Sequence, residues 1–260
     1  MAVRFKNFVF LLLCFLFLLA SAGCAPKNKL DSIKKTGVLK VGVKSDVPGF
    51  GYFNEVTGGY EGLEIEIAKL IAHEILGDSG KIQFEAVTPK TRGPMLNEDI
   101  VDMIIATFTV TEERKFSYSF SAPYYTDSVG IMVKKDSNLT TLRDFNGKKI
   151  GVPMTATTRS VLNSLAKSMD IYIDFIEYPV YSEIISGLNN GKLDGFSVDL
   201  SILKAYRDWT TEIIEESFAP QPYAVATKLA DKELSGIVNA AIQRWLSDGT
   251  IEGLIHRFNL

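Results

Sequence analysis

A short segment recurs in the two halves of the chain, and this repeat limits the possible folds more than any other feature of the sequence. Leu96–Asp102 (LNEDIVD) aligns without a gap with Leu188–Asp194 (LNNGKLD). Each segment has the pattern of a helix end, a turn and the start of a strand. We therefore expect two α/β halves of similar construction, unless a common helix–turn–strand pattern has matched by chance.

Alternating hydrophobic patterns along the chain favour the same α/β class. Strand patterns such as Val38–Val43 alternate with helix patterns such as Leu63–Leu76. Two extended segments, Tyr124–Ser128 and Phe218–Pro222, are the candidate crossings between the halves. Two crossings predict a two-lobed α/β fold whose lobes are joined by two hinge strands, with a ligand cleft between the lobes. The predicted lobes are residues 38–125 together with 223–260, and residues 126–222.

The first residues have the pattern of a secretory signal peptide. A basic start precedes the apolar run Phe8–Ala20, which is short for a membrane-spanning helix, and small residues then lead to Cys24. This end resembles the cleavage site of bacterial lipoproteins. We expect residues 1–23 to be removed, Cys24 to be lipidated, and residues 24–37 to form a polar tether between the membrane and the fold. The alternative is an incidental cysteine beside the cleavage site.

Composition and missing motifs exclude several classes of function. Removing residues 1–23 takes away two of the 28 basic side chains and none of the 31 acidic ones. A mildly acidic surface without a basic stripe argues against nucleic acid as a partner. Motifs of nucleophilic, phosphate-binding or zinc-dependent sites are absent, and His73 and His256 lack metal-ligand spacing. We predict that the protein is not an enzyme and has no metal or cofactor, and we expect a monomer.

The segment Asp102–Arg114 (DMIIATFTVTEER) contains the clearest indication of a binding site. Its short apolar run, typical of a buried strand, ends in alternating threonines that begin at Thr107. Thr109 followed by Glu112 has the spacing of a capping box, which predicts a helix that starts there with Arg114 near its first turn. A cation at that end opposes the helix dipole, which favours an anion beside Arg114. The segment is either a carboxylate clamp or a capped surface helix with a solvated arginine.

Two further cations lie on segments that leave elements of the first half. Lys44 follows the strand Val38–Val43, and Arg92 lies where a helix is predicted to begin. Each is either a solvated surface charge or, together with Arg114, one of three cations aimed at the same cleft. Three cations suit a ligand with two carboxylates, because an unpaired charge in a closing cleft is costly.

The second half offers a possible negative charge. Asp199 stands at a strand end and aligns with Thr107 when the repeat is extended. It is either the N-cap of the following helix or the partner of a ligand ammonium. Tyr181, at a helix start, is either a packing residue or a pocket residue that uses its hydroxyl. Glu64 and Glu66, on the polar side of the first long helix, are expected to be solvated.

Several segments resemble the family 3 bacterial extracellular solute-binding proteins, the binding components of amino-acid ABC importers. Gly62–Ile67 (GLEIEI) and Ala106–Tyr125 (ATFTVTEERKFSYSFSAPYY) are similar to its most recognisable motifs, and the similarity extends from about Leu39 to Leu260. The resemblance implies a type II periplasmic-binding-protein-like fold. Finer matches are similar to the branch that binds aspartate or glutamate: VGVKSDVP (Val41–Pro48), KTRGPML (Lys90–Leu96), ATTR (Ala156–Arg159) and FSVDLSIL (Phe196–Leu203).

The resemblance also implies a role for each candidate residue. In that branch the residues matching Arg114, Thr107 and the turn with Thr157 hold the α-carboxylate of the ligand, and the residue matching Asp199 binds its α-ammonium. Residues matching Lys44, Arg92 and Tyr181 meet the side-chain carboxylate or close the pocket. Thr109, between Thr107 and Arg114, completes the predicted ligand-binding set.

The resemblance implies capture of aspartate or glutamate outside the cytoplasm and delivery to an ABC permease, with a membrane anchor through the N-terminal lipid. Three alternatives stay open. The ligand is instead a neutral amide amino acid such as glutamine, or the chain is a secreted arogenate or cyclohexadienyl dehydratase on the same scaffold, or it is a sensor module.

Overall fold

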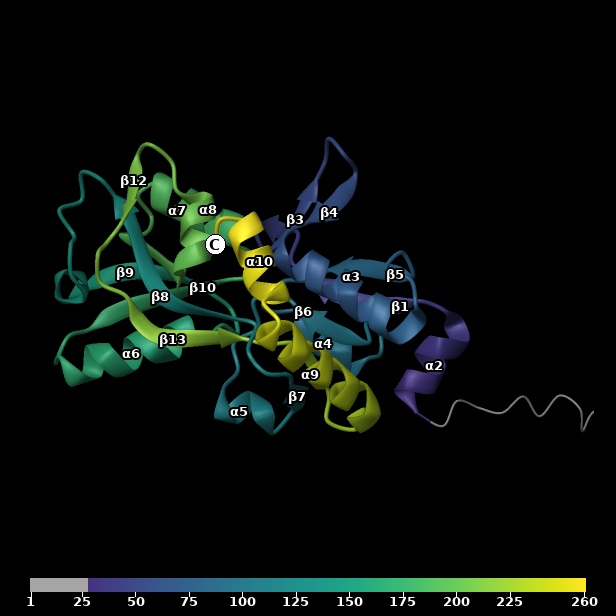
Figure 1. The fold of residues 1–260 in the computed structure, drawn as a ribbon. Coiled ribbons are helices and arrows are strands. Elements are labelled where there is room, and N and C mark those ends of the chain that lie inside the picture. The colour runs from purple at the N-terminus through teal and green to yellow at the C-terminus, as the bar shows by residue number, and fades with distance from the viewer. Residues whose placement is uncertain (1–27) are drawn as a thin grey trace, which may run out of the picture.

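A computed structural model describes residues 28–260, which form two α/β lobes that lie side by side (Figure 1). The predicted two-lobed fold is confirmed. The predicted signal peptide and the predicted lipidation site Cys24 lie outside the described residues. Within residues 28–260 no helix has the length and apolar character needed to cross a membrane.

Lobe 1 is the part of the chain around a five-stranded sheet. Its strands are Leu39–Val43 (β1), Ile82–Ala86 (β5), Met103–Ile105 (β6), Tyr118–Phe120 (β7) and Ala226–Lys228 (β14), in the order β5-β1-β6-β14-β7. Its helices are Lys29–Thr36 (α2), Leu63–Leu76 (α3), Arg92–Asn97 (α4), Glu112–Lys115 (α5), Lys232–Ser247 (α9) and Thr250–Arg257 (α10). A small sheet of Asp46–Val47 (β2), Gly51–Asn54 (β3) and Gly59–Glu61 (β4) projects from this lobe (Figure 1).

Lobe 2 is built around a second sheet of similar construction. Its strands are Tyr125–Lys134 (β8), Lys148–Pro153 (β9), Ile173–Tyr178 (β10), Gly195–Asp199 (β11), Thr211–Ile213 (β12) and Phe218–Tyr223 (β13). The order is β10-β9-β11-β8-β12, and β13 also pairs with β8. Its helices are Thr158–Ser168 (α6), Tyr181–Asn189 (α7) and Leu200–Tyr206 (α8), with a 3₁₀ turn at Leu142–Phe145.

The sequence repeat corresponds to the same structural unit in the two lobes. Asp102 precedes β6 and Asp194 precedes β11, each after a helix end and a turn. The Asp102 amide donates to the Lys40 carbonyl at 2.8 Å, and its carboxylate accepts from the Lys40 amide at 2.9 Å. Asp194 makes the same two contacts with Lys149 of β9, each at 2.8 Å. Each aspartate thus fixes the register of parallel strands whose carboxyl ends face the other lobe.

Two antiparallel strands connect the lobes. β8 and β13 pair in a register that places Tyr125 opposite Tyr223 and Asp127 opposite Gln221. They contain most of the two predicted crossings, and α9 and α10 follow them and pack on lobe 1 (Figure 1). The lobe boundaries at 125/126 and 222/223 stay a prediction.

The predicted tether at residues 24–37 is wrong where the structure describes it. Lys29–Thr36 forms α2, whose N-cap Asn28 accepts a hydrogen bond from the Asp31 amide at 2.8 Å. Leu30 and Ile33 are buried where α2 packs against α9. Two apolar residues three positions apart are enough to dock one face of a short helix, although its other residues are polar.

Gly62 allows α3 to begin without a side-chain cap. The amides of Leu63 and Glu64 donate to the carbonyls of Gly49 and Phe50 at 2.8 and 3.0 Å. This close approach needs the backbone of Gly62 at φ 126°, where a Cβ would lie 2.2 Å from the Phe50 carbonyl oxygen. Only glycine fits this position without moving the backbone.

Gly62→Ala should lower the free energy of unfolding by roughly 2–4 kcal/mol, because it adds both backbone strain and a clash with a carbonyl. Gly58→Ala is the matched control, since Gly58 also has a positive φ but no atom within 4 Å of the added Cβ. That control should cost only about 1–2 kcal/mol. Urea unfolding measures both variants, and equal losses would contradict the clash.

Candidate functional site

The predicted site residues come from strand ends and helix starts that face each other across the two lobes. Lys44 follows β1, Thr107 follows β6, and Asp199 is the last residue of β11. The carboxyl ends of parallel strands are where open α/β sheets bind ligands. The lobes touch here, because the Thr155 hydroxyl of lobe 2 donates to the Pro89 carbonyl of lobe 1 at 2.6 Å.

Arg114 reaches from lobe 1 to lobe 2. Its Nη1 donates to the Thr109 carbonyl at 2.7 Å, and its Nη2 donates to the Thr155 carbonyl at 2.9 Å. A cavity of about 630 Å³ is lined by both Arg114 and Thr157. Burial, together with the neighbouring Arg92 guanidinium, lowers the pKa of Arg114, which stays charged at neutral pH. Within residues 28–260, no carboxylate lies within ion-pairing distance of Arg114.

The capping box predicted at Thr109 is wrong. The helix α5 begins at Glu112, and its N-cap is Thr111, whose hydroxyl accepts from the Arg114 amide at 3.1 Å. Thr109 instead forms a β-bridge with Tyr223 and is buried. The bridge keeps the chain extended at Thr109, so the helix starts later than the spacing predicts.

Arg92 is buried at the start of α4. Its Nη1 donates to the carbonyls of Ala106 and Thr107 at 2.7 and 3.2 Å. The Phe108 ring is shared by two cations, since its centroid is 4.1 Å from the Arg92 guanidinium carbon and 4.7 Å from that of Arg114. Cation–π contacts offset part of the cost of burying two guanidinium groups close together.

Lys44 is buried and already has an anionic partner. Its ammonium lies 2.9 Å from the Asp46 carboxylate and 4.5 Å from the centroid of the Tyr181 ring. Burial lowers the pKa of Lys44, and Asp46 acts in the opposite direction. Tyr181 is therefore a buried wall of the site from lobe 2, and Lys44 contributes less unpaired charge than the sequence predicts.

Asp199 is buried on lobe 2. It occupies the N-cap position of α8 but makes no side-chain hydrogen bond to that helix. Its carboxylate accepts from the Tyr223 hydroxyl. Burial raises the pKa of Asp199 to about 7, although the Tyr223 hydrogen bond and the nearby Arg92 and Arg114 act to lower it. The two cations are thus close enough to influence Asp199, but no ion pair joins them to it within residues 28–260.

The two remaining threonines have different environments. Thr107 has an unusual backbone with φ 44°, and its amide donates to Glu64 at 2.6 Å. The Thr157 hydroxyl donates to the Gln221 side chain at 2.7 Å. The next residue, Thr158, is buried at the start of α6, and its hydroxyl has no hydrogen-bond partner among the described residues. Sequence reasoning missed Thr158.

Glu64 corrects another expectation, because it is fully buried and not solvated. Its Oε1 accepts from the Thr107 amide and from the Tyr124 hydroxyl, each at 2.6 Å. Burial raises the pKa of Glu64 to about 7. The sequence did contain a signal, since Glu64 lies on one helical stripe with the buried residues Ala68, Ile71 and Ile75.

The model of the family "bacterial extracellular solute-binding proteins, family 3" matches residues 39–260. The chain belongs to this family. The predicted family resemblance is therefore confirmed, and with it an extracytoplasmic solute-binding protein. The names of the relatives do not single out one branch of the family, because they include both glutamine-binding and glutamate-binding proteins.

Three curated relatives of this solute-binding protein differ in what they bind. It is 37% identical to a glutamine-binding protein of Geobacillus stearothermophilus over 206 residues, which cover 78% of this chain and 77% of that protein. It is 33% identical to a glutamine-binding protein of Bacillus subtilis over 235 residues, or 89% and 85% of the two chains. A glutamate-binding protein of Corynebacterium glutamicum is 26% identical over 234 residues, or 85% and 78%.

Solved structures show the same fold. A cysteine-binding protein from Campylobacter jejuni has a TM-score of 0.80 and 30% identity, covering 89% of this chain and 92% of that chain. An ancestral amino acid-binding protein described as a precursor of cyclohexadienyl dehydratase has a TM-score of 0.76 and 27% identity, covering 89% and 99%. The curated relatives described above are named as amino-acid-binding proteins.

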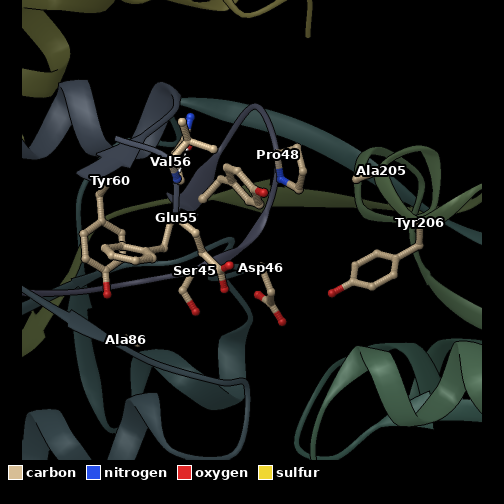
Figure 2. Close-up of a pocket in the computed structure, with 12 residues that line it drawn as sticks. Ser45, Asp46, Pro48, Glu55, Val56, Tyr60, Ala86, Ala205 and Tyr206 are labelled. Carbon is tan, nitrogen blue, oxygen red and sulfur yellow. Dashed lines mark hydrogen bonds between the residues drawn. The ribbon is translucent and has the colours of Figure 1, made fainter. Parts of the chain in front are cut away.

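A wide cavity of about 790 Å³ lies beside the ion pair of Lys44 and Asp46, and Asp46 is one of its lining residues. It is lined by the small β2-β3-β4 sheet of lobe 1 and by Ala205 and Tyr206 of lobe 2. Figure 2 shows the Tyr206 hydroxyl pointing toward Asp46. Burial and the Asp46 carboxylate raise the pKa of Tyr206. The partner of Lys44 thus also faces lobe 2, at the edge of the site.

As the pH rises from about 5 to 7, the free energy of unfolding of Glu64→Gln should increase relative to that of the unchanged protein. The folded protein holds a proton on Glu64 more tightly than the unfolded chain, since the pKa rises from 4.5 to about 7 on folding. The unchanged protein therefore loses stability across this window, by up to about 1.4 kcal/mol per pH unit. Glutamine does not titrate, and its carbonyl still accepts from the Thr107 amide.

Urea unfolding at several pH values measures this difference. The matched control is Glu66→Gln on the same helix, which removes a carboxylate that forms a partly exposed ion pair with Lys69. The same pH slope for Glu64→Gln and for the unchanged protein would contradict the titration of Glu64.

Proposed function

We propose that this protein is the binding component of an amino-acid ABC importer and that its ligand is aspartate or glutamate. The arrangement of charges supports an amino acid as the ligand. Arg114 of lobe 1 and Asp199 of lobe 2 are a cation and an anion that influence each other across the site without forming an ion pair. They suit the α-carboxylate and the α-ammonium of one zwitterion.

The unpaired charge of Arg92 is the observation that supports an acidic amino acid as the ligand. Its guanidinium is buried and donates only to two carbonyl oxygens, which solvate the charge but do not neutralise it. No carboxylate of residues 28–260 lies within ion-pairing distance of Arg92. A side-chain carboxylate on the ligand would supply the missing negative charge, and the cost of leaving a buried cation unpaired disfavours a neutral side chain.

Glutamine is the second candidate, and two observations favour it. Two relatives are named as glutamine-binding proteins. In addition, the ion pair between Lys44 and Asp46 neutralises one of the three cations on which the acidic prediction depends. A thermal-shift screen against the twenty amino acids tests both candidates, since a ligand that binds only the folded form raises the unfolding temperature.

Cleft closure is the mechanism that this arrangement supports. Site residues come from both lobes, and the strands β8 and β13 connect the lobes beside the site. A ligand that contacts Arg114 and Asp199 together favours the closed form over the open one, and a permease distinguishes the two forms. The dehydratase alternative needs a placed general acid. Glu64 and Asp199 have pKa values of about 7, but Glu64 is held by the Thr107 amide and the Tyr124 hydroxyl, and Asp199 is held by the Tyr223 hydroxyl.

We also propose that Cys24 is lipidated and anchors the protein to the membrane. Cys24→Ser should then release the processed protein from the membrane fraction of the producing bacterium, because the lipid attachment point is lost. Cell fractionation and mass spectrometry of the N-terminus measure this outcome. An N-terminal cysteine without lipid in the mass spectrum of the unchanged protein would contradict the anchor.

Arg114→Gln should weaken the binding of aspartate, glutamate and glutamine alike by about 2–4 kcal/mol, since it removes the partner of the shared α-carboxylate. Isothermal titration calorimetry measures the affinities. The control is Arg159→Gln, which removes an exposed guanidinium paired with Glu177 at 3.1 Å. If Arg114→Gln bound these ligands with unchanged affinity, Arg114 would not be the partner of the α-carboxylate.

Arg92→Gln should weaken glutamate binding at least about tenfold more than glutamine binding, because only glutamate loses a charge partner. The two ligands have nearly the same shape, so each serves as the control for the other. Equal losses for the two ligands would show that Arg92 does not meet the side-chain carboxylate.

A further inference from the structure

Tyr223 lies outside every predicted role, but it makes the hydrogen bond that holds Asp199. Tyr223 is the last residue of β13 and is fully buried. Its hydroxyl lies 2.5 Å from Oδ2 of Asp199. The other oxygen of that carboxylate accepts no hydrogen bond within residues 28–260 and is free to face a ligand.

A second carboxylate competes for the same hydroxyl. Oδ2 of Asp127, on β8, lies 3.3 Å from the Tyr223 hydroxyl. The Asp127 carboxylate already accepts from the Ser201 amide at 3.0 Å, from the Ser201 hydroxyl, and from the Ser128 amide at 2.8 Å. A phenol has one proton, and both the shorter distance and the unfilled oxygens assign that proton to Asp199.

The ring of Tyr223 is fixed by its neighbours. It stacks on Tyr125 with centroids 6.0 Å apart, and it meets the edge of Phe50 at 5.8 Å. Tyr125 and Tyr223 are also directly opposite in the pairing of β8 with β13. The hydroxyl is therefore presented from the pair of strands that connects the lobes, and it has little freedom to turn away.

We propose that Tyr223 is a positioning residue, whose hydroxyl orients the Asp199 carboxylate toward the α-ammonium of the ligand. This inference rests on the proposed amino-acid binding but not on which amino acid is bound. A hydrogen bond to the charged form of a carboxyl favours that form. Tyr223 thus counteracts the effect of burial, which raises the pKa of Asp199.

The other groups that face Asp199 set the background for its titration. They are Asp127 from β8, which raises the pKa of Asp199, Arg92 from α4 and Arg114 from α5, which lower it, and Tyr181 from α7. Of these groups, Asp127 alone has a hydrogen-bond contact with the Tyr223 hydroxyl, and that contact is longer than the one to Asp199. A shift in the pH profile therefore reports on the Tyr223–Asp199 contact.

The test is Tyr223→Phe, measured by titration calorimetry with glutamate and with glutamine between about pH 6 and 8.5. The affinity should fall about tenfold at neutral pH, with a larger loss at low pH and a smaller loss at high pH, because Asp199 of the variant is ionised only at higher pH. The matched control is Tyr125→Phe, since Tyr125 lies in the same ring stack and its hydroxyl has no hydrogen bond within the described residues. That control should stay within about twofold of the unchanged protein.

Asp127→Asn should shift the pH dependence of ligand affinity in the opposite direction. It removes the charge that raises the pKa of Asp199, while its side-chain oxygen can still accept from Ser201. The decline of affinity at low pH should therefore move to lower pH. This second variant shows whether the low-pH decline reports on Asp199, and the unfolding temperature of Tyr223→Phe shows whether that variant is folded.

The outcomes separate this inference from the proposed function. If the unchanged protein binds glutamine and not glutamate, the acidic ligand is wrong, and the same variants test Tyr223 with glutamine. If it binds no amino acid, both proposals fail. A loss for Tyr223→Phe that is the same at every pH, or that Tyr125→Phe reproduces, would overturn the positioning role.

Discussion

The site depends on buried charges that face each other without pairing. Arg92 of lobe 1 and Asp199 of lobe 2 are buried and Arg114 of lobe 1 is partly buried, yet within residues 28–260 no ion pair joins them. Carbonyl oxygens, the Phe108 ring and the Tyr223 hydroxyl stabilise these charges without neutralising them. Such an arrangement is costly in the protein alone, so a zwitterion that contacts both lobes gains much from completing it.

The repeated sheet architecture explains why these charges meet. In each lobe an aspartate at the start of a central strand, Asp102 or Asp194, fixes the neighbouring strand through two backbone contacts. The register of the strands is therefore set, and the loops that follow their carboxyl ends are presented to the opposite lobe. The strands β8 and β13 close the arrangement and place Tyr223 and Asp127 behind Asp199.

The proposed ligand depends on which cations of the site are already neutralised by neighbouring carboxylates. Asp46 partners Lys44, so this cation is partly neutralised before any ligand binds. Glu64 holds the Thr107 amide and lies near Arg92 and Lys44, and its pKa of about 7 makes its charge depend on pH. Arg92 is the remaining cation that a side-chain carboxylate could satisfy, so the proposed preference for glutamate over glutamine depends on it.

The sequence alone determined the family, the two similar lobes, and which residue types gather at the strand ends, because periodicity, turns and motifs are local patterns. It failed where a distant segment decides the local structure. The bridge to Tyr223 delays the helix after Thr109, and the loop at Thr107 covers Glu64. Likewise, the partners of Lys44 and Asp199 became known only in the tertiary structure. Burial and charge pairing arise between segments far apart in the chain, so spacing along the sequence cannot specify them.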